Sequence, residues 1–162
     1  MKHTTFTTPI EDRYFEDYEA GSVYEFGSIA VEEAEVLDFA RRFDPQVFHS
    51  DPEAAKRTVF GGLIASGWHT AAMMMRLFAD HFLSWSASLG SPGVDELRWT
   101  RPVRPGDELS IRVTVLEANR SRSKPDRGSI LSFVEVCNQN HEVVLTVKAV
   151  NFLLCRETPQ QG

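Results

Sequence analysis

The chain has few cysteines and no long uninterrupted run of hydrophobic residues. Its two cysteines, Cys137 and Cys155, each lie in an apolar stretch, and neither belongs to a C-x-x-C pair or another metal-site spacing. A disulfide between them is compatible with the sequence, but we expect reduced core thiols. No apolar stretch reaches the roughly 20 residues that cross a bilayer. The N-terminus shows no signal-peptide pattern, so we expect a cytoplasmic protein with no membrane partner.

Basic residues are also fewer than acidic ones. The 162 residues include 17 Lys and Arg against 23 Asp and Glu, which gives a net charge of −6. This balance disfavours nucleic acid as the main partner. The chain lacks a G-x-G-x-x-G motif, a P-loop and any His/Cys/Asp/Glu cluster with ligand spacing. We therefore expect no metal and no redox cofactor.

The composition of the chain is typical of a globular protein, with 42% hydrophobic and 25% charged residues. Its length predicts one compact domain over residues 1–162, with a core at about 12–155 and frayed termini formed by the first dozen residues and RETPQQG. Residues 32–43 place apolar side chains at helical spacing, and Pro45 ends that helix. Residues 50–57 predict a short helix capped by Ser50 or Asp51. The stretch 68–82 is apolar on nearly all sides, which predicts a buried central helix.

The remaining chain has strand character. Residues 22–31 alternate, and residues 93–103 have β character. The runs 111–116, 130–136 and 143–153 are joined by short turns, so an antiparallel meander is expected. One buried helix with such a sheet predicts an α+β fold in which the sheet curls around the helix.

Three stretches carry a family resemblance: FDPQVFHSDPEAA at 43–55, FGGLIASGWHT at 60–70 and RPVRPGDEL at 101–109. In this order and spacing they resemble the MaoC-like dehydratases, relatives of the R-specific enoyl-CoA hydratases, over residues 12–155. The resemblance implies a hot-dog fold. Asp44 and His49 keep the spacing of the family's D-x-N-P-L-H motif, whereas Gln46 and Val47 replace its Asn and Pro. Ser66 stands where the family often has histidine.

The resemblance implies an acyl-CoA hydratase/dehydratase that adds or removes water at the 2,3 double bond of an enoyl thioester. The substrate is carried by coenzyme A and no further cofactor is needed. This reaction requires a base, an acid and donors for the thioester oxygen, and histidine suits proton transfer because its ordinary pKa is near neutrality. The resemblance assigns the catalytic roles to Asp44 and His49, which hold one water molecule between them.

Substrate contacts are expected around the start of the central helix, where unpaired backbone amides favour negative charge. The candidates are Gln46, Gly62, Ser66, Gly67 and Trp68. Gln46 orients substrate or water, or else bonds to its own turn. We expect Ser66 and His69 to face the helix start or a subunit interface rather than to catalyse.

Several alternatives remain at this point. The three consecutive methionines at 73–75 belong either to the hydrophobic core or to the lining of an acyl tunnel. The loop 119–128 is either a solvated hairpin or a contact for coenzyme A phosphates; its basic residues are Arg120, Arg122, Lys124 and Arg127. RPVRPGD is expected to form a structural turn.

Two other functions also remain. A hot-dog thioesterase is disfavoured because the central helix has no carboxylate from Gly67 until Asp80. The other is a non-catalytic acyl-CoA-binding module. Uncovered strand edges and the resemblance predict a homodimer or higher homo-oligomer.

Overall fold

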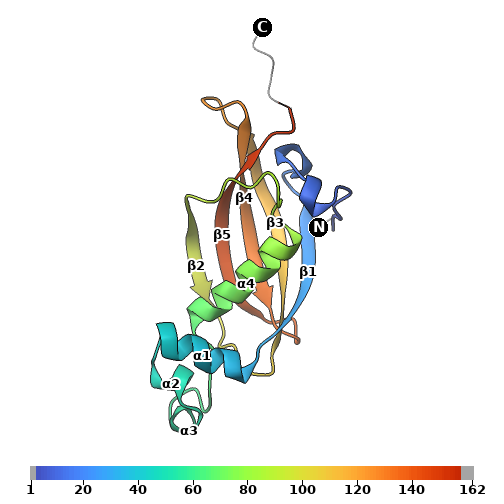
Figure 1. The fold of residues 1–162 in the computed structure, drawn as a ribbon. Coiled ribbons are helices and arrows are strands. Elements are labelled where there is room, and N and C mark those ends of the chain that lie inside the picture. Colours follow the sequence, from blue (N-terminus) through green and yellow to red (C-terminus); the bar gives the residue numbers. More distant parts are fainter. Residues whose placement is uncertain (1–2, 158–162) are drawn as a thin grey trace.

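The computed structural model describes residues 3–157 as a curled five-stranded sheet packed against one long helix (Figure 1). The order across the sheet is β1-β3-β4-β5-β2, and every neighbouring pair is antiparallel. The predicted meander of the last three strands is confirmed, and the two edges are β1 and β2. The strands are β1 (Val23–Ala30), β2 (Gly93–Trp99), β3 (Glu108–Arg120), β4 (Arg127–Cys137) and β5 (Val143–Leu154).

One face of the sheet is buried. Every second residue of β4 is buried, from Gly128 to Val136, while the residues between them are partly exposed. Val113, Val134 and Val147 lie side by side on this face across β3, β4 and β5, and all are almost fully buried. Branched side chains pack well on such a pleated surface. The face therefore forms a continuous apolar floor for the helix.

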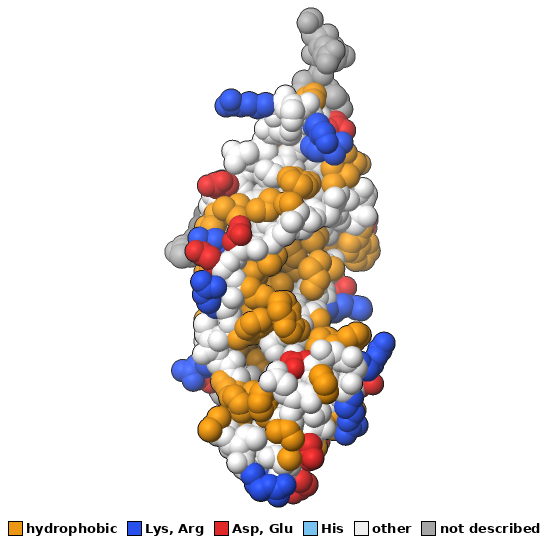
Figure 2. Space-filling view, turned by 90° about the vertical axis from the view of Figure 1, so that its left-hand side faces the viewer, with side chains coloured by type: hydrophobic (Ala, Val, Ile, Leu, Met, Phe, Trp, Pro, Cys, Tyr) orange, Lys and Arg blue, Asp and Glu red, His pale blue; other side chains and the backbone are white. Residues whose placement is uncertain are grey.

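The long helix α4 (Gly67–His81) crosses this floor (Figure 1). Met73, Met74, Leu77 and Phe78 are buried against it. The prediction that this helix is buried on all sides is wrong for a single chain. The sheet covers only one side of α4. Figure 2, which faces the β2 edge, shows hydrophobic side chains gathered on the surface. The exposed large hydrophobic residues of α4 and β2 are Trp68, Met75, Val94 and Trp99.

Three short helices lie at one end of the sheet, beside the start of α4 (Figure 1). They are α1 (Glu33–Phe43), α2 (Val47–Ser50) and α3 (Pro52–Ala55). α1 ends where Pro45 predicted, and Asp51 caps α3 by accepting from the backbone N–H groups of Glu53 and Ala54. The single turn of α2 was not predicted, because four residues between two prolines carry no readable period.

The N-terminal segment is docked on the body of the protein, so the expected fraying is wrong for residues 3–12. His3 pairs with Val23, and the rings of Phe6 and Tyr24 stack with centroids 4.0 Å apart. The Arg13 guanidinium lies 3.6 Å from the Phe6 ring centroid. Two 3-10 turns follow, Ile10–Asp12 and Phe15–Asp17. At the other terminus Arg156 pairs with Asp17, and residues 158–162 lie outside the described part of the chain.

The loop between β3 and β4 lies at the end of the sheet opposite to α2 and α3 (Figure 1). Arg127 forms an ion pair with Asp126, and Arg120 donates to the carbonyls of Pro125 and Glu157. These local contacts match a solvated hairpin loop.

Other predicted local features are present. The thiols of Cys137 and Cys155 are free, and burial raises the pKa of both. RPVRPGD forms a turn in which Asp107 accepts from the Arg104 backbone N–H. None of the helices in residues 3–157 is long and apolar enough to cross a membrane.

Candidate active site

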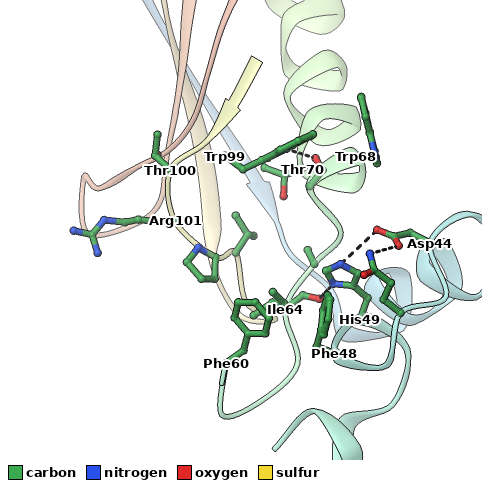
Figure 3. Close-up of a pocket in the computed structure, with 15 residues that line it drawn as sticks. Asp44, Phe48, His49, Phe60, Ile64, Trp68, Thr70, Trp99, Thr100 and Arg101 are labelled. Carbon is green, nitrogen blue, oxygen red and sulfur yellow. Dashed lines mark hydrogen bonds and ion pairs between the residues drawn. The ribbon is translucent and has the colours of Figure 1, made fainter. Parts of the chain in front are cut away.

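Asp44 and His49 face one another at the wall of a cavity (Figure 3). Asp44 is the C-cap of α1, and His49 lies on the single turn of α2. The chain reverses between these helices, which brings the His49 Nε2 atom to 3.4 Å from the Asp44 Oδ2 atom. The sequence motif therefore corresponds to a real pairing of the two side chains.

The Asp44 carboxylate accepts two side-chain hydrogen bonds. Gln46 Nε2 donates to Oδ1 at 2.8 Å, and Ser66 Oγ donates to Oδ2 at 2.6 Å. Burial raises the pKa of Asp44, but the hydrogen bonds from Ser66 and Gln46 and the neighbouring His49 outweigh it, so the pKa lies below its usual value. Asp44 is thus held as a carboxylate in a fixed orientation.

His49 is buried, and its ring is fixed from the opposite side. Its Nδ1 lies 2.8 Å from the Ile64 carbonyl oxygen, while the Ile64 backbone N–H donates to the Phe48 carbonyl at 3.0 Å. A carbonyl only accepts hydrogen bonds, so the Nδ1 atom must carry a hydrogen. In the neutral ring Nε2 then presents a lone pair towards Asp44 and the cavity.

Ser66 is the N-cap residue of α4, yet its side chain does not cap the helix. The hydroxyl instead points to Asp44, so the prediction that Ser66 faces the helix start or an interface is wrong. The first backbone N–H groups of a helix have no partner within it. In the described part of the chain, those of Gly67 and Trp68 have no acceptor elsewhere either. Two residues that line the cavity therefore each carry a free backbone N–H donor.

The cavity has a volume of about 450 Å³, and two phenylalanines and two tryptophans are among the residues that line it (Figure 3). Gln46, Gly67 and Trp68 line it, as their predicted substrate contacts require. Gly62 and Ser66 do not line it: a Cβ atom on Gly62 would meet the Arg104 side chain, and the Ser66 hydroxyl is bonded to Asp44. The other lining residues are Phe48, Phe60, Ile64, Ala65, Thr70, Trp99, Thr100, Arg101, Pro102 and Val103.

Trp99, at the end of β2, is a wall residue that the sequence did not predict. Its indole N–H donates to the Gly67 carbonyl at 2.7 Å. A Cβ atom on Gly67 would lie 2.5 Å from the indole ring, so glycine is required here by Trp99. The two residues are 32 positions apart, and the only sequence signal nearby is the RPVRPGD motif that starts two residues after Trp99.

His69 faces away from this cavity. Its ring stacks on Phe39 of α1 with centroids 4.9 Å apart, and burial lowers its pKa. Its buried Nδ1 atom has no hydrogen-bond partner within residues 3–157. The expectation that His69 does not catalyse stays a prediction, and its position beside α1 is compatible with it.

Comparison with known proteins identifies the family. Residues 17–135 match the family model described as the MaoC like domain. The chain belongs to the MaoC-like family. This MaoC-like chain is 30% identical to YdeM of Bacillus subtilis over 109 residues, which is 67% of the chain and 77% of YdeM.

Two solved structures resemble this MaoC-like protein. A MaoC-like dehydratase from Rhodospirillum rubrum is 41% identical with a TM-score of 0.82, covering 90% of this chain and 99% of that one. The R-hydratase PhaJ1 from Pseudomonas aeruginosa is 25% identical with a TM-score of 0.67, and the match covers 92% of this chain and 95% of PhaJ1. The predicted family and its hot-dog fold are confirmed.

No metal cluster is found in the described part of this MaoC-like chain. Residues 3–157 contain no group of three or more His, Cys, Asp or Glu side chains arranged to hold an ion. The absence of a cofactor stays a prediction from the sequence.

Proposed function

We propose that the protein is a hydratase/dehydratase that adds or removes water at the 2,3 double bond of an enoyl thioester carried by coenzyme A. The observation that carries this proposal is the Asp44–His49 pair at the wall of the cavity, 3.4 Å apart and fixed by bonds from both sides. The likeness to a MaoC-like dehydratase and to an R-hydratase supports it.

The pair suits proton transfer to and from one water molecule. In its neutral form His49 has a lone pair on Nε2, and the ionised Asp44 has one on Oδ2, so two acceptors then face each other. A water molecule that donates one hydrogen to each acceptor is therefore oriented for reaction. His49 takes a proton from this water as the oxygen bonds to C3 of the substrate. The proton passes to Asp44 and is delivered to C2, so the pair ends the cycle unchanged.

The thioester oxygen gains negative charge as the water adds. The free N–H groups of Gly67 and Trp68 at the start of α4 are suited to bind it, since the helix dipole also favours an anion there. A capping hydroxyl would occupy such a donor, but Ser66 binds Asp44 instead. Ser66 therefore orients the carboxylate and leaves the helix amides free for substrate.

An assay on crotonyl-CoA tests this function directly. Loss of the enoyl absorbance without release of free coenzyme A is expected. Release of free coenzyme A would instead indicate a thioesterase, although α4 carries no carboxylate before Asp80, which is paired with Arg76. Tight binding of acyl-CoA without turnover of any enoyl-CoA in a broad panel would contradict the proposal and indicate a binding module.

Replacing Ser66 with alanine should lower kcat by roughly 10-fold or more, because a hydrogen bond to a charged group contributes about 1.5–3 kcal/mol. Its loss also removes a contact that favours the carboxylate, so the pKa of Asp44 should rise. The acid limb of the kcat/KM profile should then move to higher pH. Stopped assays between pH 4 and pH 9 measure both effects.

The matched control is Ser50→Ala. Ser50 Oγ donates to the Gln46 carbonyl at 3.0 Å and does not touch Asp44. This variant should keep the parent pH profile. An unchanged profile in Ser66→Ala would show that Ser66 does not position the carboxylate.

We also propose that the protein works as a homodimer or higher homo-oligomer. The edge strand β2 and the open side of α4 expose Trp68, Met75, Val94 and Trp99. Light scattering at micromolar concentration should give at least twice the chain mass of 18.3 kDa. Val94→Arg on β2 should lower this mass, whereas Leu116→Arg on β3 should not. A monomeric parent would contradict this proposal.

A further inference from the structure

Trp99 closes one side of the cavity. Its ring lies against the Gly67 backbone, and its edge contacts Trp68 with ring centroids 5.1 Å apart and planes at 78°. Figure 3 shows the indole extending across the cavity next to Thr70. The hydrogen bond to the Gly67 carbonyl fixes this orientation. The indole is therefore a wall held in place by the chain.

No channel leads from the cavity along the buried side of α4. Met73 and Met74, which could have lined an acyl tunnel, belong to the hydrophobic core, and Met75 lies on the open face of the helix. None of the three lines the cavity. The remaining inner wall is made of buried side chains: Ile64, Ala65, Thr70 and Val103.

The cavity is also small for the ligand it is proposed to hold. Its volume of about 450 Å³ lies near the lower end of the ~300–1,000 Å³ that is typical of ligand sites. The thioester and the end of the pantetheine arm must share this space with the acyl group. An acyl chain much longer than four carbons fills the walled part of the cavity and has to pass Trp99, which is itself partly exposed on the open side of the molecule.

We propose that Trp99 limits the substrate to short acyl chains of the crotonyl size. This inference rests on the proposed function and specifies its substrate class. A chain that is too long must displace the indole, which would break the bond to Gly67 and its contact with Trp68. Discrimination between chain lengths thus follows from a fixed wall rather than from a polar contact.

Binding of saturated acyl-CoA tests the proposal without any need for turnover. In a Trp85→Phe protein, the two remaining tryptophans both line the cavity, so their fluorescence reports on the site. Butyryl-CoA should bind at least about 10-fold more tightly than octanoyl-CoA, since one misplaced methylene in an apolar pocket is already worth 10-fold or more. Adding Trp99→Ala should remove this preference by enlarging the cavity. Trp99→Leu is a second, less drastic variant that should reduce it.

Trp85 provides the control because it is exposed and bonds to the Ala79 carbonyl, outside the cavity. The Trp85→Phe protein should keep the parent preference among enoyl-CoA substrates of four to ten carbons. Equal affinity for butyryl-CoA and octanoyl-CoA, or a preference that survives Trp99→Ala in folded protein, would overturn the role of Trp99. Selective binding of butyryl-CoA without hydration would instead overturn only the proposed function.

Discussion

Replacing Asp44 with asparagine is expected to lower kcat on crotonyl-CoA by roughly 10²–10⁴-fold, the usual cost of losing one general acid or base. Asparagine keeps the size of the side chain: its oxygen can accept from Gln46, and its NH2 group can donate to the Ser66 hydroxyl oxygen, which then acts as the acceptor. It cannot carry the proton that His49 takes from water. The thermal unfolding midpoint should therefore change little while turnover is lost.

His49→Ala should lower kcat by a similar factor. The double variant should have a kcat only slightly below that of either single variant, because both side chains act on one water molecule. Asp51→Asn is the matched control, since asparagine caps α3 about as well as aspartate and the carboxylate of Asp51 is outside the cavity. Near-parental turnover in both single variants would refute the assignment and direct attention to His69.

Replacing Phe82 with alanine is expected to lower the free energy of unfolding by about 3–5 kcal/mol. This side chain is fully buried, and its ring contacts those of Phe6, Tyr18, Tyr24 and Phe78. The cluster joins the docked N-terminal segment to the end of α4, and alanine would leave an empty space in the hydrophobic core there. Denaturant unfolding measures the change.

Phe43→Ala is the control for Phe82, because 65% of the Phe43 side chain is exposed. It should alter the free energy of unfolding by about 0.5 kcal/mol or less. Similar losses in the two variants would mean that the aromatic cluster does not stabilise the fold as described. A folded Phe82→Ala protein should retain the cavity, since Phe82 does not line it.

The parts of the fold that the sequence predicted are those set by local signals. Pro45 ends α1, Asp51 caps α3, and alternating residues of β4 reveal a strand with one buried face. The open side of α4 and the docking of Phe6 were missed. Both depend on which surfaces the rest of the chain reaches, and no short sequence window contains that information.

In the candidate site, too, contacts between residues close in the sequence could be predicted, and contacts between distant residues could not. Asp44 and His49 are five residues apart, so their pairing could be predicted from a motif. Ser66 reads as an ordinary helix cap, and only the fold shows that its hydroxyl lies 2.6 Å from Asp44. Trp99 reads as one more strand residue. Its contact with Gly67 joins the edge of the sheet to a helix, which spacing along the chain does not reveal.

The order of the strands also has a consequence for biosynthesis. Every residue that lines the cavity lies between positions 44 and 103, and the ribosome makes this segment before β4 and β5 exist. β2 joins the sheet by pairing with β5: Trp99 lies opposite Leu145, and the backbone N–H of Thr100 donates to the Val144 carbonyl. A nascent chain that ends before residue 143 therefore holds all the cavity residues but lacks the strand that positions β2. The cavity can be completed only after β5 has left the ribosome.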